Sequence, residues 1–476
     1  MRFLPLLCLT LPLVPATAQA PLTRTDSALV ARVLLAEQMR DTSAAAFGPA
    51  LQHPDSVVRQ LARRALARIA DPRFQERTAF TSALPPKRWP EPSWKARFRA
   101  LSATSNCDAL ASALTDSVWP VRLRAVAVLP ATCSATPGVL TRLEGWVLDG
   151  LPANASRRAR NGVSWHAAAY GLEALARMHP NGALPALRRF EGHPQWQVRR
   201  AAARAATTLQ LGPQLRQLAR DAHPNVQEAA IQGLAKLTAH ADDALYLELL
   251  GSTHAATVRA AAMALKGSTD TTVAPRALTV FRKWVTLQDA SAHDVRVALL
   301  EAAGRTAADD QPPARKPDLP AAAVRLALGA PVLLRVEMDK SAGGGGTFTV
   351  RLRGDVAPIM AAKILELVQQ KYYDRTTWHR VEHDFVIQGG TPGDNEFVGL
   401  NSFLIDELGT LPHPRGTIGM STRGHDTGDA QWFINLKDNA RLTGDYTVFG
   451  EVIEGIDVVD AVMEGDMIRR IVVVSE

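Results

Sequence analysis

The sequence lacks the patterns on which several large classes of protein depend. It contains only three cysteines and no Cys-x-x-Cys pair, and it shows no phosphate-binding loop and no Ser/His/Asp triad. The run Gly343–Gly346 lacks the Lys-Ser/Thr that completes a phosphate-binding loop, so we interpret it as a turn. No apolar run is long enough to cross a bilayer. These absences argue against redox chemistry, nucleotide binding and an integral membrane span.

The aromatic content is also low, at 6%, whereas alanine is abundant between residues 25 and 310. This bias favours tightly packed helices, and a Val-Arg pair recurs there at the start of segments with helical spacing. His-Pro precedes three of the segments, and such a proline ends one helix and permits the first turn of the next. The pairs, with one variant, are Val58-Arg59, Val121-Arg122, Val198-Arg199, Val226-Gln227, Val258-Arg259 and Val295-Arg296.

A helix pair of this size cannot bury its apolar face alone, so neighbouring pairs must stack. The later pairs follow one another at intervals of 28, 32 and 37 residues. This pattern resembles HEAT-type repeats, and the resemblance implies an α-solenoid over residues 21–306. A non-repetitive helical bundle is the alternative.

The borders of this region carry their own signals. Residues 1–20 are typical of an export signal, because Arg2 precedes an apolar centre and the small-x-small site Ala18-Gln19-Ala20. We therefore expect cleavage near Ala20 and a periplasmic or extracellular protein. Cys8 lacks the preceding small residues of a lipoprotein signal, so lipid anchoring is the lesser alternative. Residues 307–328 contain four prolines and predict a semi-rigid linker.

Charge is divided unevenly along the chain. Residues 331–476 carry 14 Lys/Arg and 22 Asp/Glu, a net charge of −8, whereas the preceding residues carry +15. A basic helical surface fits an acidic partner. Nucleic acid is the usual one, but the export signal opposes it and leaves an anionic membrane surface, an acidic client or the acidic C-terminal region. A merely solvated Arg-rich surface is the alternative.

Four motifs follow one another in the C-terminal region: Trp378–Thr391 with its His-Arg and Gln-Gly-Gly, Gly416–Thr422, Ala430–Leu436 and Tyr446–Val452. Together they resemble the signatures of the cyclophilin family of peptidyl-prolyl cis-trans isomerases. The resemblance covers residues 329–476. It implies a closed antiparallel eight-stranded β-barrel with a helix over each open end, so the whole chain is predicted to be a multidomain α and β protein.

Prolyl isomerisation requires no nucleophile, metal or cofactor. Its barrier is amide resonance, about 18–20 kcal/mol, and a site lowers the barrier by binding the twisted amide best. That site needs an apolar pocket and a fixed cationic donor, a role that suits arginine. The resemblance implies Arg380, Phe385, Gln388 and Phe433 as catalytic residues. It implies Val386, Met420, Ser421, Thr422, Gln431, Leu442 and Tyr446 as substrate-binding residues.

Several residues have a second interpretation or depart from the family pattern. Arg380 can pair with Glu382 or Asp384, and the aromatic residues can be ordinary core. Arg441 stands before Leu442, where the family usually carries Trp or Phe, so one aromatic wall is missing. We therefore expect an exported isomerase that assists protein folding, with Pro-containing clients and a possible partner on the helical repeats. A non-catalytic Pro-peptide-binding scaffold is the main alternative, and a helical-repeat nucleic-acid protein is a third.

The string His379-Arg-Val-Glu-His383 also fits a zinc-protease motif, but that chemistry needs the two histidines one turn apart on a helix. Here the context predicts a strand, in which they stand about 13 Å apart, so we expect no metal site.

Cys107 and Cys133 are the only cysteines left after signal removal. Export exposes them to an oxidising compartment, and they flank two candidate helices, Asp108–Leu114 and Val121–Leu129, that would form an antiparallel hairpin. We expect a disulfide between them, with two separate buried thiols as the alternative.

Overall fold

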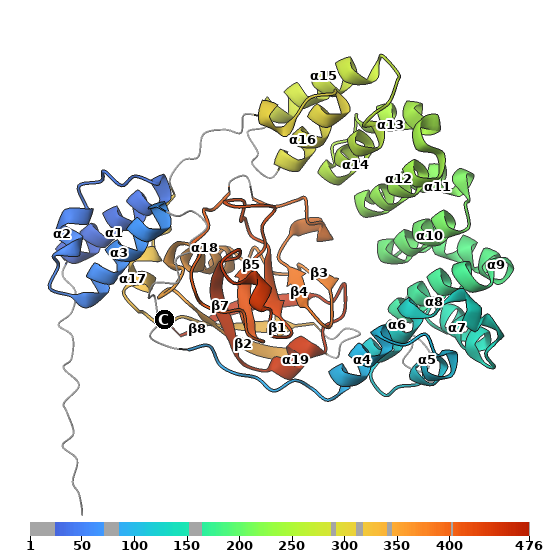
Figure 1. Ribbon diagram of the computed structural model, residues 1–476, viewed down its shortest axis with the longest axis horizontal. Coiled ribbons are helices and arrows are strands. Elements are labelled where there is room, and N and C mark those ends of the chain that lie inside the picture. The colour runs from blue at the N-terminus through green and yellow to red at the C-terminus, as the bar shows by residue number, and fades with distance from the viewer. Residues whose placement is uncertain are drawn as a thin grey trace, which may run out of the picture.

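A computed structural model describes residues 24–70, 85–151, 164–286, 292–310, 318–339, 345–400 and 403–475. The predicted export signal lies outside these residues. A curled β-sheet occupies the centre of the molecule, an arc of helices surrounds one side of it, and three further helices lie on the other side (Figure 1). Within the described ranges, no helix is both long and apolar enough for a membrane crossing.

The helical arc consists of helix pairs that stack side by side, with α10, α12 and α14 facing the sheet and α9, α11 and α13 on the outside (Figure 1). Its helices are α4 (Trp94–Ser102), α5 (Cys107–Ala113), α6 (Trp119–Val128), α7 (Val139–Asp149), α8 (Trp165–Met178), α9 (Pro180–Glu191), α10 (Trp196–Thr208), α11 (Gly212–Leu218), α12 (Pro224–Thr238), α13 (Asp243–Leu249), α14 (Ala255–Leu265), α15 (Val273–Thr286) and α16 (His293–Ala302). Short 3₁₀ turns, η1 (Ala131–Ala135), η3 (Ala239–Asp242) and η5 (Ala307–Asp309), separate or follow some of them.

The recurring Val-Arg pair has a structural meaning. All six valines are at most 1% exposed. In four of the six segments the residue after the valine donates to a loop carbonyl six residues earlier: Arg59 donates to His53 at 2.5 Å, and Arg199 donates to His193 at 2.8 Å. Arg259 and Arg296 instead pair with Glu228 and Asp310. The pair therefore supplies one core residue and, in those four segments, one hydrogen bond that ties the helix to the preceding loop.

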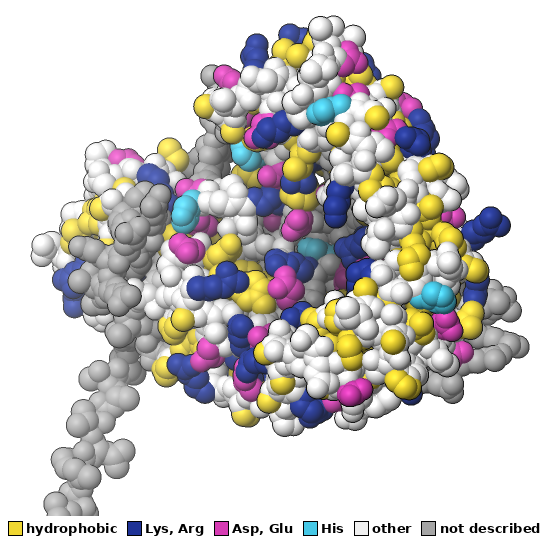
Figure 2. All heavy atoms as spheres, turned by 45° about the vertical axis from the view of Figure 1, so that its right-hand side comes forward, with side chains coloured by type: hydrophobic (Ala, Val, Ile, Leu, Met, Phe, Trp, Pro, Cys, Tyr) yellow, Lys and Arg dark blue, Asp and Glu magenta, His cyan; other side chains and the backbone are white. Residues whose placement is uncertain are grey.

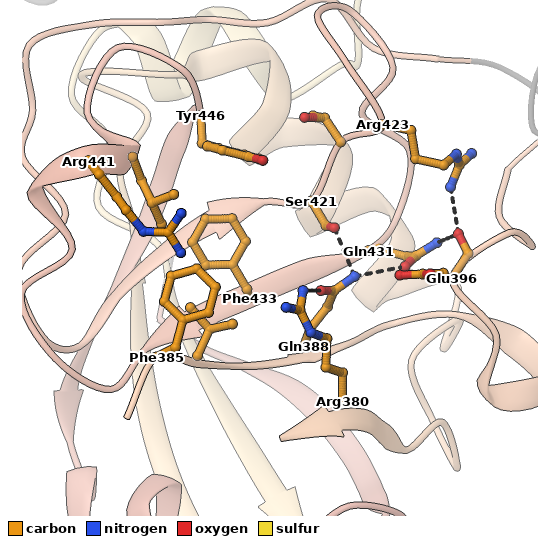
Figure 3. Close-up of a pocket in the computed structure, with 13 residues that line it drawn as sticks. Arg380, Phe385, Gln388, Glu396, Ser421, Arg423, Gln431, Phe433, Arg441 and Tyr446 are labelled. Carbon is orange, nitrogen blue, oxygen red and sulfur yellow. Dashed lines mark hydrogen bonds between the residues drawn. The ribbon is translucent and has the colours of Figure 1, made fainter. Parts of the chain in front are cut away.

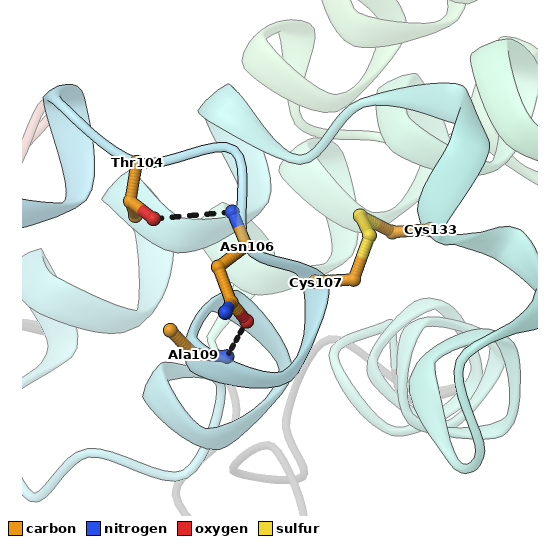
Figure 4. Close-up of a disulfide and its surroundings, with 5 residues drawn as sticks. All are labelled: Thr104, Asn106, Cys107, Ala109 and Cys133. Atoms are coloured by element: carbon orange, nitrogen blue, oxygen red, sulfur yellow. Dashed lines mark hydrogen bonds between the residues drawn. A yellow bond between two sulfur atoms is a disulfide. The ribbon is translucent and has the colours of Figure 1, made fainter.

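A disulfide joins Cys107, the first residue of α5, to Cys133 in η1 (Figure 4). This is the pairing predicted from the sequence, with a Cα–Cα separation of 5.3 Å. The start of α5 is also capped, because the Asn106 side chain accepts a hydrogen bond from the Ala109 amide at 3.0 Å. The bond therefore holds the entry of one helix hairpin to its exit.

The N-terminal helices, α1 (Arg24–Met39), α2 (Phe47–Leu51) and α3 (Ser56–Ala70), do not stack on the arc. They share one hydrophobic core with the sheet and with α17 (Ala323–Ala327). The sequence analysis grouped these helices with the repeats and assigned α17 to the linker over 307–328, of which 311–317 lie outside the described residues. Helices α1–α3 therefore pack against the sheet, although the arc is nearer to them in the sequence.

The central sheet has eight antiparallel strands in the order β3-β4-β6-β5-β7-β2-β1-β8. They are β1 (Leu333–Met338), β2 (Gly346–Leu352), β3 (Trp378–Val381), β4 (Val386–Gly389), β5 (Thr417–Met420), β6 (Trp432–Asn435), β7 (Val448–Glu454) and β8 (Ile468–Ser475). The predicted full closure of the barrel is wrong: among the described residues the edge strands β3 and β8 form no ladder, and one isolated bridge, Thr377–Met467, lies just before both of them. Helices α18 (Pro358–Gln369) and α19 (Ile456–Asp460) accompany the sheet.

The arc contacts the sheet domain, meaning β1–β8 with α18, α19 and their loops, through polar side chains along its inner side. The His166 Nε2 atom lies 2.6 Å from the Glu464 carbonyl oxygen, and Asn225 donates to the Asp394 carbonyl at 3.1 Å. Near the far end, Arg423 pairs with Asp294 of α16. The arc is therefore in contact with the sheet domain from α4 to α16 rather than held only by a linker.

Candidate functional site

A cavity of about 270 Å³ opens at the edge of the sheet where β3, β4 and β6 lie side by side (Figure 3). It is lined by Arg380, Phe385, Val386, Gln388, Glu396, Ser421, Thr422, Arg423, Gln431, Phe433, Arg441, Leu442 and Tyr446.

One half of the cavity is apolar. Phe433 and Leu442 pack together with Val386, and Phe385 and Tyr446 cover this small cluster. The Phe433 and Tyr446 rings meet edge to face with their centroids 5.7 Å apart. These surfaces form a pocket for a compact apolar ring.

Two residues, His413 and Gly419, fix the position of the Phe433 ring. His413 stacks against the ring at 6.2 Å, and burial lowers the pKa of His413 to about 4, so the imidazole is neutral. Gly419 lies on the neighbouring strand, and a Cβ atom there would come within 2.3 Å of the Phe433 ring. Glycine at this position therefore lets the ring lie against β5.

The other half of the cavity is a hydrogen-bonded polar row (Figure 3). The Arg380 guanidinium donates to Glu382 through Nε at 2.9 Å and to the Gln388 side chain through Nη1 at 3.2 Å. Gln388 in turn donates to the Ser421 hydroxyl at 2.9 Å and to Gln431 at 3.3 Å. Arg380 is thus oriented by two acceptors while its side chain remains 43% exposed to the cavity.

Strand register explains why these residues meet. Arg380 on β3 lies opposite Gln388 on β4, and Gln388 lies opposite Phe433 on β6. Three residues far apart in sequence therefore form one row across three neighbouring strands, with the cation at one end and the aromatic ring at the other.

The structure brings together ten of the eleven residues that the sequence predicts for the groove. The exception is Met420, which does not line the cavity. Its side chain is fully buried in the core shared by the sheet and the N-terminal helices, because alternation along β5 turns it away from Ser421. Arg380 does pair with Glu382, as the structural interpretation allowed, and this pair coexists with a place in the cavity.

Two lining residues, Glu396 and Arg423, were not predicted. They lie on loops, and the Arg423 guanidinium donates to the Glu396 carbonyl at 2.6 Å across the rim. Loop residues that meet only in the folded chain have no spacing from which to predict them. Arg441, in place of the expected aromatic residue, lies with its guanidinium carbon 4.4 Å from the Phe385 ring centroid, so a cation covers this ring.

Among the described residues that line the cavity there is neither histidine nor cysteine. His379 and His383 have separate surroundings, since His379 faces the arc helices α10 and α12 whereas His383 packs against Trp94 and Phe98. No cluster of three or more potential metal ligands occurs in the part of the chain that the structure describes. What the cavity offers is an apolar pocket beside an oriented cation.

Comparisons with known proteins agree with this geometry. Residues 334–474 match the family model described as cyclophilin type peptidyl-prolyl cis-trans isomerase/CLD. A peptidyl-prolyl cis-trans isomerase of Helicobacter pylori is 34% identical over 131 residues, which are 27% of this chain and 80% of the relative. Peptidyl-prolyl cis-trans isomerase B of Bacillus subtilis is 32% identical over 129 residues, which are 27% of this chain and 90% of the relative.

A crystal structure of a Cryptosporidium parvum cyclophilin type peptidyl-prolyl cis-trans isomerase aligns with 31% of this chain and 99% of that chain, at 24% identity and a TM-score of 0.28. The sequence relatives match over most of their own length. The range that the family model matches contains the positions of the row described above. The chain therefore belongs to the cyclophilin-type peptidyl-prolyl cis-trans isomerases, and its C-terminal sheet domain carries that activity.

Proposed function

We propose that the chain is an exported prolyl isomerase that assists the folding of Pro-containing clients, with Arg380 as its catalytic donor. In this mechanism the proline ring enters the apolar half of the cavity, between Phe433 and Leu442. The Arg380 guanidinium hydrogen-bonds the proline nitrogen as that atom becomes pyramidal, and it thereby withdraws the lone pair from the amide. The twisted amide is bound better than either planar isomer, which lowers the barrier.

The observation that carries this mechanism is the placement of Arg380. Its guanidinium is held by Glu382 and Gln388 at the edge of the apolar cluster, so little reorganisation is needed when charge shifts on the substrate. Gln388 and Gln431 present amide groups along the polar row, where they can hydrogen-bond the substrate backbone.

The test is a protease-free isomerisation assay on the full chain. Arg380→Ala removes one oriented donor and is expected to lower kcat/KM by about 10²–10³-fold with the fold intact. Arg469→Ala is the matched control, because Arg469 is an exposed arginine on β8, outside the cavity. Equal turnover by the Arg380→Ala and Arg469→Ala variants would refute the assignment.

Export and the repeat architecture are parts of the same proposal. The disulfide between Cys107 and Cys133 supports an oxidising compartment. The recurring hydrogen bond from a helix arginine to the preceding loop supports HEAT-type repeats, which we propose hold clients or a protein partner. A mature amino terminus near Pro21, found by intact mass of the protein from its native host, is the expected result. A mature chain that retains residues 1–20 would contradict export by this signal.

A further inference from the structure

The cavity around Arg380 and Phe433, where the client proline is proposed to bind, is called the proline cavity below, and two further cavities share residues with it. A second cavity of about 290 Å³ lies between the sheet domain and helices α10 and α12, and it shares Arg380 and Glu396 with the proline cavity. A third, of about 300 Å³, lies against α4, α6 and α8 and shares Phe385. The three cavities therefore adjoin one another, and the proline cavity is the middle one.

The arc supplies one wall of each outer cavity. Leu123, Ala127 and Tyr170 come from the arc and face Phe385 of the sheet domain in the third cavity. The charged Arg124, Glu382 and Asp384 line the same cavity, so it is mixed in character. Its apolar part suits a bulky apolar side chain.

The second cavity is polar. Arg204 and Gln232 line it from α10 and α12, and both are exposed. His379 lines it from the sheet domain, and among the described residues neither of its ring nitrogens has a hydrogen-bond partner. Burial lowers the pKa of His379 to about 4, so the imidazole is neutral and offers one donor and one acceptor. Together with the exposed Arg204 and Gln232, this makes the second cavity a place for polar and backbone groups.

We propose that the three cavities form one substrate channel that binds an extended client segment on both sides of its proline. The mixed cavity at α4–α8 takes a large apolar side chain against Leu123, Ala127 and Phe385 on one side of the proline, and the polar cavity at α10–α12 takes backbone and polar groups on the other. The proposal rests on the proposed function, since it places the client proline beside Arg380.

The shape of the molecule fits an unfolded client. Figure 2 shows the surface hollowed between the arc and the central domain, with charged side chains around the hollow. An extended chain advances about 3.3 Å per residue, so a few residues on each side of the proline reach beyond the middle cavity. A folded domain presents its proline on a convex surface and does not fit between two walls. The arc thus makes the enzyme selective for extended segments.

Binding of labelled peptides to the full chain tests the channel without depending on turnover. One peptide has four residues around a single X-Pro bond, and two longer peptides add six residues, including Leu and Phe, on the amino or the carboxyl side. We expect at least one longer peptide to bind about tenfold tighter than the short one, since burying a single large apolar side chain accounts for that factor. Equal dissociation constants for all three would overturn the proposal.

Paired variants locate the effect. Ala127→Trp fills the mixed cavity from an exposed position on α6, and Ala109→Trp makes the same change at an exposed position on the outer helix α5. The long-to-short affinity ratio is expected to fall towards one in Ala127→Trp and to stay about ten in Ala109→Trp. Gln232→Trp, with the exposed Gln217→Trp of α11 as its control, tests the polar cavity in the same way.

Equal ratios within each pair would refute the channel. If the wild-type chain binds the long peptide tightly but does not isomerise the short one, the proposed function fails and the channel stands.

Discussion

The sheet domain meets the rest of the chain on two sides, and the two interfaces differ in chemistry. The N-terminal helices share an apolar core with the sheet and place buried charges inside it. The arc instead touches the sheet domain mostly through hydrogen bonds and ion pairs, several of them between partly exposed side chains. The first interface is part of the fold of the isomerase domain, whereas the second leaves two cavities between the arc and the sheet domain.

Arg68 shows why the first interface is part of the fold. Its side chain is 2% exposed, pairs with Glu37 at 2.8 Å and donates to the carbonyls of Val356, Glu407 and Leu408. These carbonyls belong to the sheet domain, so α3 satisfies backbone groups there that would otherwise be buried without partners.

Loss of the Arg68 side chain should lower the free energy of unfolding more than any other change considered below. Arg68→Ala leaves Glu37 buried without this partner, and removing one member of a buried ion pair costs about 3–5 kcal/mol. Arg63→Ala changes an exposed arginine of the same helix and should alter stability by no more than about 0.5 kcal/mol. Urea denaturation of both variants measures the difference. Similar free energies of unfolding would mean that α1–α3 are dispensable to the isomerase domain.

Removal of the disulfide is the corresponding test of the arc. It closes a loop with a sequence separation of 26 residues, and on the chain-entropy model its removal costs about 3 kcal/mol. In a Cys107→Ala/Cys133→Ala variant we expect calorimetry to show the arc melting earlier, while the transition of the sheet domain with α1–α3 stays in place. A reductant should reproduce this shift in the wild type and have no effect on the variant. One common, shifted transition would show that the two regions unfold together.

Glu407 makes the first interface sensitive to pH. Its carboxylate accepts hydrogen bonds from the amides of Ile359 and Met360, at 3.2 and 2.7 Å, yet burial raises its pKa to about 7. The folded state therefore holds this proton more tightly than the unfolded chain, in which the pKa is about 4.5. The stabilisation is complete below about pH 4.5 and is lost as the pH rises through 7.

The measurement is the free energy of unfolding between pH 4.5 and 8. The wild type should lose stability over this range more steeply than Glu407→Gln, because glutamine has no proton to release. Glu366→Gln, a change on the more exposed side of α18, should follow the wild type. Parallel profiles for wild type and Glu407→Gln would show that Glu407 is not the group that titrates.

The same contrast shows what the sequence can reveal. The residues of the proline cavity could be predicted because their motifs resemble the cyclophilin signatures. The strand register then shows why they meet: Arg380, Gln388 and Phe433 form one row. The disulfide was predictable because elimination left only two cysteines. Met420 was assigned to the groove because it belongs to a motif that resembles the family pattern, but strand alternation turns its side chain into the core.

The packing of α1–α3 could not be predicted in this way. Arg68 resembles any other arginine of the helical repeats, and most of its partners are backbone carbonyls about 290–340 positions away. A carbonyl has no residue identity, so nothing in the sequence marks these contacts. The flanking cavities are hidden for the same reason, since Ala127 and Phe385 become neighbours only when the arc folds against the sheet domain.

The smallest expected effect concerns a single ion pair of the second interface. Asp384 accepts from Arg99 of α4 at 2.7 Å and lies 3.2 Å from Lys437, and these side chains are 25–40% exposed. Partly exposed pairs contribute about 0.2–1 kcal/mol, and 1 M salt shortens the screening length to about 3 Å. Asp384→Asn should therefore cost less than about 1 kcal/mol at low salt and almost nothing at 1 M. Glu301→Gln removes a comparable exposed pair with Lys266 inside the arc and serves as the control.

Small-angle scattering adds a readout specific to the interface between the arc and the sheet domain. The radius of gyration of Asp384→Asn should match that of Glu301→Gln at low salt, because many other contacts hold the arc in place. A larger radius in Asp384→Asn alone would mean that this one pair closes the arc, and the second interface would then be far weaker than its number of contacts implies.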